Sequence, residues 1–290
     1  MLPLESVPNF SEGRDSSTVA AIAAVLGARA RLLDVHSDPD HNRSVFTLVG
    51  GEDALVDALV AGIETAVEHI DLRQHVGAHP RVGAADVVPI VPLRADDLPR
   101  AQATAERLGA IVGERLGIPV FLYDPPARGT AFYRQGGLER LAARLAAGEL
   151  APDFGPARLH ETAGAVIAGA RAPLIAFNVN LRGPVEAART IAANVRERGG
   201  GYPGVRALGL ALPSVGLVQV SMNVEDWEAA ALHEIVARIE REAETLGVEV
   251  VGSELVGLMP AGAAAAAAGA ALRIDGFDQS HVLELRLLDD

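Results

Sequence analysis

The chain has 290 residues, of which 49% are hydrophobic and 4% aromatic, and its formal net charge at pH 7 is -13. This length suits one large domain or two smaller ones, and the acidic balance argues against a nucleic-acid scaffold and against a polybasic membrane anchor. The absence of cysteine and lysine excludes disulfides, thiolate nucleophiles, Schiff-base lysines and a Walker-type phosphate-binding loop.

Helix and strand periodicities alternate along the first part of the chain. The pattern predicts strand 4–9, helix 16–28, strands 31–36 and 43–49, helix 52–69 and strand 86–91. That order (strand, helix, strand, strand, helix, strand) is the order of a ferredoxin-like unit. An extension follows, and its predicted elements are helix 95–116, strand 120–123, helix 131–147 and strand 165–168.

The second part of the chain repeats the same order of elements. Its pattern predicts strand 174–180, helix 184–198, strands 205–212 and 215–223, helix 226–246 and strand 248–254. We therefore expect an α+β fold of two duplicated ferredoxin-like (βαββαβ) subdomains, residues 1–172 and 173–290, with a cleft between them.

Signals for export or membrane insertion are not visible in the pattern. The first residues lack the basic region and apolar run of a signal peptide, and no segment offers about eighteen uninterrupted apolar residues for a membrane span. We therefore expect a cytoplasmic protein that binds neither membranes nor nucleic acids.

The segment from Gly77 to Asp86, with the sequence G-A-H-P-R-V-G-A-A-D, concentrates unusual residues in one loop. Gly77 and Gly83 permit backbone conformations that other residues avoid, and Pro80 fixes the chain directly after His79. A rigid loop that presents a histidine suits acid–base chemistry near neutral pH. The loop therefore predicts an active-site segment, with His79 as its acid–base residue.

Two earlier segments also gather polar residues. After the first predicted strand, Asn9, Ser11 and Glu12 are placed either to contact a small polar ligand or to cap the next helix. In the loop 34–43, Asn42 and Arg43 favour substrate binding. The same loop leaves open a metal site in a metal-dependent hydrolase, because imidazole and carboxylate groups suit zinc or manganese. The ligands of that alternative are His36, Asp38, Asp40 and His41.

Later segments allow a binding interpretation and a structural one. The loop 152–164 is either a ligand-binding loop near the subdomain boundary or a linker. In the second half, Asn178 and Asn180 alternate with apolar residues, as do the polar residues at 219, 221 and 223. Each set therefore lies on one side of a strand, where it lines a wet cleft or faces solvent.

Taken in order, these segments resemble the formiminotransferase domain of the glutamate formiminotransferase family. The shared segments are V-P-N-F-S-E-G at 7–13, N-R at 42–43, H-P-R at 79–81, P-D-F-G-P at 152–156, A-F-N at 176–178 and V-G-S at 251–253. The resemblance spans nearly the whole chain, and we expect no appended cyclodeaminase domain.

The resemblance implies a homodimeric enzyme that transfers the formimino group of N-formimino-L-glutamate to N5 of tetrahydrofolate, its co-substrate, without a metal. It implies that His79 is the catalytic histidine and that the folate-contacting loop is 155–164. Arginines 43, 81 and 171 suit the carboxylates of glutamate and folate. The predicted binding residues are Asn9, Ser11, Glu12, Asn42, Arg43, Arg81, Gly155, Pro156, His160, Glu161, Gly164 and Asn178.

Two positions depart from the family pattern. His36 and Ala78 stand where the animal enzymes of the family carry an aspartate and a glutamate. The departures leave two further alternatives open. One is an enzyme that acts on formylglutamate or a formyl-folate, and the other is a non-catalytic homologue that binds the ligand.

Overall fold

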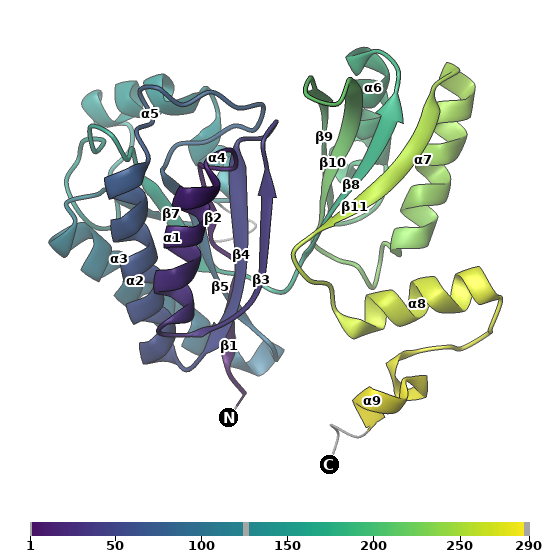
Figure 1. The fold of residues 1–290 in the computed structure, drawn as a ribbon, viewed down its shortest axis with the longest axis horizontal. Coiled ribbons are helices and arrows are strands. Elements are labelled where there is room, and N and C mark those ends of the chain that lie inside the picture. Colours follow the sequence, from purple (N-terminus) through teal and green to yellow (C-terminus); the bar gives the residue numbers. More distant parts are fainter. Residues whose placement is uncertain (1, 124–127, 287–290) are drawn as a thin grey trace. The chain divides into compact units, whose positions relative to one another are not determined.

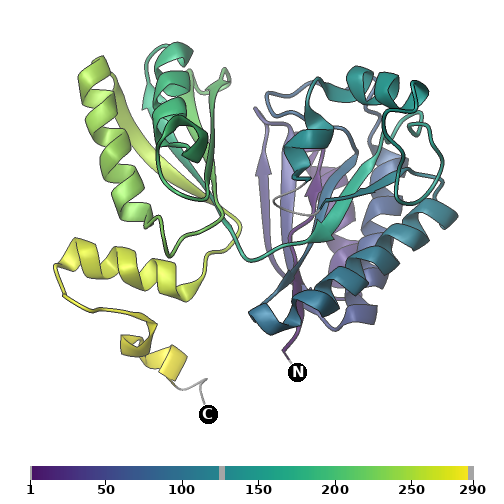
Figure 2. The same cartoon turned by 180° about the vertical axis from the view of Figure 1, so that it is seen from behind.

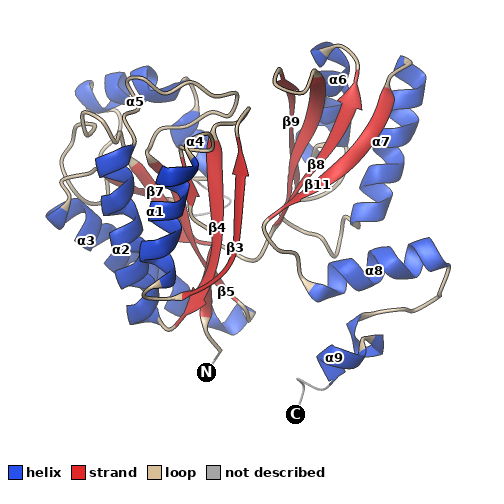
Figure 3. Ribbon diagram, in the orientation of Figure 1, coloured by secondary structure: helices blue, strands red, loops and turns tan. Residues whose placement is uncertain are grey.

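The structure is a computed structural model that describes residues 2–123 and 128–286 (Figure 1). The chain divides into two compact units, Met1–Ala172 and Pro173–Asp290. Each unit combines helices with one β-sheet, as Figure 3 shows in blue and red, and this confirms the expected α+β class. Within the described residues, no helix is both long enough and apolar enough to cross a membrane.

A seven-stranded sheet forms the centre of the first unit. Its strands are β1 (Leu4–Ser6), β2 (Asn9–Phe10), β3 (Arg31–Asp38), β4 (Arg43–Gly50), β5 (Ala85–Pro92), β6 (Val120–Leu122) and β7 (Val166–Ala170). β3 pairs with β4, which pairs with β1 and β2, and these pair with β5, all antiparallel. β7 and β6 then continue the sheet beside β5 as parallel strands.

The register of this sheet decides which loops meet. Phe10 lies opposite Ser44 on β4 and opposite Ala85 on β5. The end of β2 and the starts of β4 and β5 therefore share one end of the sheet. The segments 11–14, 39–42 and 77–84 all adjoin that end.

Helices cover both faces of the first sheet. On one face lie α1 (Ser16–Gly27), α2 (Glu52–His69) and α3 (Leu98–Arg115), the last preceded by the 3-10 turn η1 (Ala95–Asp97) (Figure 1). On the other face lie the short α4 (Thr130–Arg134) and α5 (Gly137–Ala146). Val120 belongs to the large core under the first set and Phe121 to the smaller core under the second, because successive residues of a strand point to opposite faces.

The second unit is a four-stranded antiparallel sheet with the strand order β11-β8-β10-β9. Its strands are β8 (Ile175–Arg182), β9 (Val205–Leu212), β10 (Leu217–Val224) and β11 (Glu249–Val256). Its helices are α6 (Val185–Val195), α7 (Leu232–Leu246), α8 (Ala261–Leu272) and α9 (Leu283–Arg286), with the 3-10 turns η2 (Glu197–Gly199) and η3 (Gln279–His281). Helices α6 and α7 pack on one face of the sheet, as seen from behind in Figure 2.

Three predicted elements differ from the structure. The helix expected over 131–147 breaks into α4 and α5, because Gly136 and Gly137 adopt left-handed φ angles of 81° and 68°. The helix expected from 226 begins only at Leu232, after a turn in which Asp226 accepts a hydrogen bond from the backbone N–H of Ala229. The first strand is interrupted at Pro8, which has no N–H to donate to a neighbouring strand.

Candidate active site

The His79 loop is packed tightly against the turn between β3 and β4. The backbone N–H of Ala78 donates to the carbonyl of Asp40 at 3.1 Å, and the Asn42 side-chain amide donates to the carbonyl of Val76 at 3.1 Å. Gly77 is needed here, since a Cβ at this position would lie 2.4 Å from the carbonyl oxygen of His41. The two segments therefore form one rigid substructure.

Arg81 ties this substructure together through its guanidinium group. It donates to the carbonyl oxygens of His41 at 2.7 Å, of Asn42 at 2.8 Å and of His79 at 2.9 and 3.2 Å, and it contacts the ring of His75. Burial lowers the pKa of Arg81 to about 10, so it remains charged at neutral pH. Most of its donors are therefore committed to holding the loop, whereas the sequence had suggested that it holds a substrate carboxylate.

His79 is held as one neutral tautomer. Its Nδ1 lies 2.8 Å from the carbonyl oxygen of Pro80, and its Nε2 lies 3.2 Å from Nη1 of Arg43. A carbonyl only accepts and a guanidinium only donates, so Nδ1 carries the proton and Nε2 carries the lone pair. The chemistry that this tautomer offers is proton acceptance at Nε2.

The charges around His79 favour the same state. Burial of the imidazole, followed by the nearby charges of Arg43, Arg134 and His41, holds the pKa of His79 well below its usual 6.5. The ring is therefore neutral at pH 7 in the free chain. The pKa of Arg43 is lowered to about 10, mainly by burial and next by Arg134.

Asp86 anchors the other end of the loop. One of its oxygens accepts the backbone N–H groups of Val82 at 2.7 Å and Gly83 at 3.2 Å, and the other is paired with Arg134. A Cβ at Gly83 would lie 1.9 Å from the carbonyl oxygen of Ala165, so only glycine fits. The buried carboxylate thus joins the loop to helix α4.

Arg134 was not predicted from the sequence. It follows Tyr133, whose ring stacks on Phe121 at 5.1 Å and whose hydroxyl donates to the carbonyl of Leu122 at 2.8 Å. These contacts fasten α4 to β6 and place the Arg134 guanidinium beside Asp86. One arginine in a predicted helix is an ordinary feature, so the sequence carries no signal for it.

Of the predicted residues in the first segment, Ser11 contacts the His79 loop, whereas Glu12 and Asn9 have local contacts. The Ser11 hydroxyl donates to the carbonyl of Gly83 at 2.7 Å, and the side-chain oxygen of Asn42 accepts the N–H of Gly13 at 3.0 Å. Glu12 accepts two backbone N–H groups at the start of α1, at 2.7 and 2.9 Å. Asn9 donates to the nearby carbonyl of Val7 at 2.9 Å, within its own turn.

The metal-site alternative is not supported by the placement of its ligands. One oxygen of Asp38 accepts the N–H groups of Asp40 and His41 at 2.8 Å each, as in a tight turn, and its other oxygen lies 3.7 Å from Nδ1 of His41. Among the described residues, no group of three or more His, Cys, Asp or Glu side chains is arranged to hold a metal ion.

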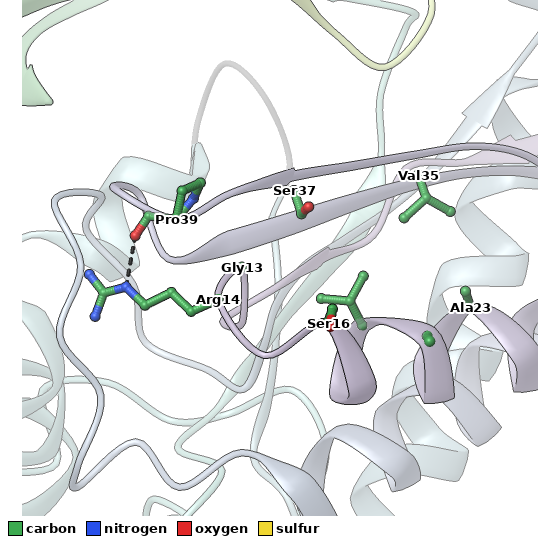
Figure 4. A pocket seen from close by; sticks show the side chains of 9 residues that line it. Gly13, Arg14, Ser16, Ala23, Val35, Ser37 and Pro39 are labelled. Carbon is green, nitrogen blue, oxygen red and sulfur yellow. Dashed lines mark hydrogen bonds between the residues drawn. The ribbon is translucent and has the colours of Figure 1, made fainter. Parts of the chain in front are cut away.

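A hollow of about 510 Å³ lies between α1 and β3, next to this region (Figure 4). Arg14 lines it and donates from Nε to the carbonyl of Pro39 at 2.8 Å. The hollow contains neither His79 nor Arg43 among its lining residues, which are Gly13, Arg14, Ser16, Val19, Ala20, Ala23, Val35, Ser37 and Pro39.

Family models match almost the entire chain. Residues 3–171 match the formiminotransferase domain, N-terminal subdomain, and residues 176–276 match the formiminotransferase domain. The chain belongs to the formiminotransferase family. The resemblance expected from the sequence is therefore confirmed.

Two relatives within the formiminotransferase family are similar over nearly their full length, and a third is a longer protein. The glutamate formimidoyltransferase of Streptococcus pyogenes serotype M1 is 38% identical, over 98% of each chain. That of Thermoplasma acidophilum is 40% identical, over 98% of this chain and 97% of the relative. The formimidoyltransferase-cyclodeaminase of Rattus norvegicus is 41% identical over 89% of this chain, which spans 50% of that longer protein.

The predicted folate-contacting loop, residues 155–164, contacts the His79 loop. The N–H of Ala84 donates to the carbonyl of Ala163 at 2.9 Å, and Gly83 forms a β-bridge with Gly164. Within the loop, Nδ1 of His160 accepts the N–H of Ala163 at 3.1 Å, and Glu161 pairs with Arg73 at 2.7 Å. Part of the predicted folate loop is therefore in contact with the His79 loop.

The start of the same loop has a structural explanation. Gly155 has a left-handed φ of 80°, and a Cβ there would lie 2.4 Å from the carbonyl oxygen of Ile118. The carbonyl of Pro156 accepts the N–H of Arg158 at 2.8 Å, which closes a turn. These contacts explain both residues without a ligand.

Two further predicted residues have contacts within their own units. Asn178 is in the second unit, where its amide donates to Glu254 at 3.0 Å, beside a Gln219 amide that donates to Asn180 at 2.9 Å. Arg171 follows β7, and its backbone N–H donates to the carbonyl of Ile90. Ile90 lies near the C-terminal end of β5, whereas Asp86 lies near its start. Arg171 therefore lies away from the start of β5, and its contact with a substrate carboxylate stays a prediction.

Proposed function

We propose that this chain transfers the formimino group of N-formimino-L-glutamate to N5 of tetrahydrofolate, giving 5-formiminotetrahydrofolate and glutamate. Such an enzyme serves histidine degradation and one-carbon metabolism. The observation that carries the proposal is the match to glutamate formimidoyltransferases over 98% of the chain, together with a neutral histidine held in the matching loop.

The chemistry needs one group that takes a proton and returns it. N5 of the folate attacks the formimino carbon and forms a tetrahedral intermediate, and N5 loses a proton. The glutamate nitrogen must gain a proton before the bond from carbon to that nitrogen breaks. His79 performs both steps through Nε2, since its lowered pKa keeps it unprotonated before the attack. Arg43 occupies Nε2 in the free chain, so the substrate amine takes the place of that contact.

Both units have the strand order of the proposed duplicated ferredoxin-like fold. In the second unit the order β11-β8-β10-β9 places the fourth strand beside the first and the third beside the second. The first unit has the same order across β5, β1 with β2, β4 and β3, extended by β7 and β6. We accordingly assign residues 1–172 to an N-terminal subdomain that carries the catalytic histidine, and 173–290 to a C-terminal subdomain.

The proposed binding residues follow from the site and the family. Arg43 contacts His79 directly, and Asn42, Ser11 and Arg81 hold the loop that carries it. Glu12 is proposed from its place before α1 in the matching segment. Tetrahydrofolate is assigned to the loop 155–164, and Asn178 is the proposed binding residue on the second unit. The reaction requires no metal. A cytoplasmic homodimer remains the expectation from the family.

A transfer assay with four substrates tests the proposal. Transfer from formiminoglutamate to tetrahydrofolate should be fast, and reactions with formylglutamate or 5-formyltetrahydrofolate should be at least tenfold slower in kcat/KM. The opposite order would assign a formyl-transferring enzyme. Calorimetric binding of tetrahydrofolate without any transfer would assign a non-catalytic homologue.

The role of His79 is tested by substitution. His79→Ala should lower kcat by about 10²- to 10⁴-fold, because proton transfer by a positioned side chain contributes that much. The matched control is His69→Ala, which removes an exposed histidine at the end of α2 and should leave kcat unchanged. Full transfer activity in the His79→Ala protein would refute the acid–base assignment.

A further inference from the structure

We propose that Arg134, acting with Arg43, binds a substrate carboxylate beside His79, and that this carboxylate is the α-carboxylate of the amino-acid donor. The inference rests on the proposed function, because that function supplies a donor with this group. It adds a specificity-determining residue from a part of the chain, helix α4, that the sequence did not connect with the site.

The charge around His79 is unbalanced in the free chain. Arg43 and Arg134 both lie near enough to lower its pKa, and Arg81 acts on Arg43. One buried carboxylate, Asp86, faces these cations directly, and Asp38 acts on Arg43 as well. Asp86 is already committed to Arg134 and to two backbone N–H groups. A bound anion would restore the balance.

An unused hydrogen-bond donor on Arg134 supports the same proposal. Nε of Arg134 is buried, and within the described residues it has no hydrogen-bond partner. An unmade hydrogen bond on a buried charged group is costly, so such a donor usually has a partner in the working protein. The Arg81 donors are taken up by backbone carbonyls, whereas Nη1 of Arg43 contacts Nε2 of His79.

The position of the Arg134 guanidinium is fixed by contacts with two neighbouring elements. Asp86 fixes one end of the Arg134 guanidinium, and Tyr133 fastens α4 to the sheet through its stacked ring and its hydroxyl. These contacts keep the Arg134 guanidinium beside Asp86. A fixed planar donor group is suited to a carboxylate, which accepts two parallel hydrogen bonds.

The covalent structure of the donor indicates which substrate carboxylate lies beside His79. In the donor, the α-carboxylate is attached to the carbon that carries the departing nitrogen, which is the nitrogen that His79 must protonate. A cation beside His79 therefore faces the α-carboxylate whenever that nitrogen is within reach. The glutamate tail of the folate is also a carboxylate source, but the aminobenzoyl group separates it from N5. The donor is thus the ligand that fits both groups at once.

Steady-state kinetics test the pair. Arg134→Gln should raise the KM for formiminoglutamate by about 30-fold or more, the loss expected on truncating one partner of a buried charge pair, and should change the KM for tetrahydrofolate less than threefold. Arg134→Lys should recover part of the loss. The control is Arg107→Gln, on the exposed ion pair with Asp53, which should leave both constants unchanged. A rise confined to the KM of tetrahydrofolate would overturn the donor assignment in favour of the folate tail.

Binding of two inert probes separates recognition from chemistry. N-acetyl-L-glutamate carries the α-carboxylate, whereas 4-acetamidobutanoate is the same molecule without it. Calorimetry should show that the unsubstituted protein prefers the first probe by at least tenfold and that Arg134→Gln removes the preference. A preserved preference in a variant with unchanged circular dichroism would overturn the inference.

The two proposals fail in different ways. If the unsubstituted protein transfers the formimino group but Arg134→Gln has an unchanged donor KM, the proposed function stands and the inference falls. If the unsubstituted protein does not transfer from formiminoglutamate, the proposed function falls. The probe experiment then still shows whether Arg134 holds a carboxylate.

Discussion

At the scale of single residues, the proposed chemistry depends on the charge state of His79. Its tautomer is set by one acceptor, the carbonyl of Pro80, and one donor, Arg43. No carboxylate is needed to orient the ring in this chain. The lone pair at Nε2 therefore does not depend on a carboxylate at position 36 or 78, the two positions where the family resemblance predicts one.

The pH dependence follows from the lowered pKa of His79. The base must be neutral to act, so the acidic limb of kcat/KM should lie below pH 6.5, with activity lost as the pH falls through that limb. Arg43→Gln removes a cation that lowers this pKa, and the limb should therefore move upward toward pH 6.5. The pH dependence of kcat/KM, measured for the unsubstituted protein and for Arg43→Gln, gives the position of this limb. Arg107→Gln is the control and should leave the limb in place. An unmoved limb in Arg43→Gln would contradict the electrostatic account.

The buried pair of Asp86 and Arg134 should matter for stability as well as for binding. Asp86→Asn leaves the Arg134 charge without its partner, and breaking such a pair costs about 3–5 kcal/mol. Urea unfolding followed by circular dichroism measures the free energy of unfolding. Asp53→Asn removes the carboxylate of an exposed pair and should change it by less than about 1 kcal/mol. Equal losses in the two variants would argue against a buried ion pair.

At the scale of elements, the site is made where three loops meet at one end of the first sheet. The register of β2, β4 and β5 brings together the segments 11–14, 39–42 and 77–84, and the bridge between Gly83 and Gly164 adds the loop 155–164. Helix α4 joins from the other face through Arg134. Because the chain breaks at Gly136 and Gly137, α4 is a helix separate from α5.

The close approach at Gly83 gives a prediction for this junction. Gly83→Ala places a Cβ against the carbonyl of Ala165, so the loops must separate, and overpacking of this kind costs about 1–3 kcal/mol. Transfer activity should fall as well, because His79 is carried on the displaced loop. Denaturant unfolding and the transfer assay measure the two effects.

Gly51→Ala is the control for this substitution. A Cβ at Gly51 would meet no atom within 4 Å, and its φ of -68° suits any residue. The variant should keep full activity and lose no more than about 1 kcal/mol from the N-terminus of α2. If both glycine variants behave alike, the close approach has no influence on the site.

At the scale of the whole molecule, a net charge of -13 coexists with a cluster of arginines at one site. Local cations set the field that an anionic substrate meets at close range, so the acidic surface does not prevent such binding. The first sheet also ends in β3, an edge strand on which Leu33 and Val35 are each 40% exposed. An exposed apolar edge is a common surface for self-association.

The expected homodimer is a prediction at this scale. Light scattering coupled to size-exclusion chromatography should give a mass about twice the 30.1 kDa of the chain. The mass should stay constant as the protein is diluted through the micromolar range. A mass equal to one chain at all concentrations would contradict the dimer.

The sequence by itself determined the elements whose patterns are strong and local. Helix Glu52–His69 and strand Val205–Leu212 have the predicted bounds, because apolar periodicity and flanking polar residues act within a few turns of chain. The His79 loop was also visible, since glycine, proline and histidine are conspicuous in one short segment.

The tertiary structure alone decided which side chains meet. Arg81 was predicted to bind substrate but is occupied with backbone carbonyls, Arg171 lies near the other end of β5, and Arg134 arrives from a helix that the pattern ran together with the next. These assignments depend on strand register, on two left-handed glycines and on a buried carboxylate that links distant segments. Such contacts join residues 48 positions apart, as between Asp86 and Arg134, and no local pattern in a single sequence records them.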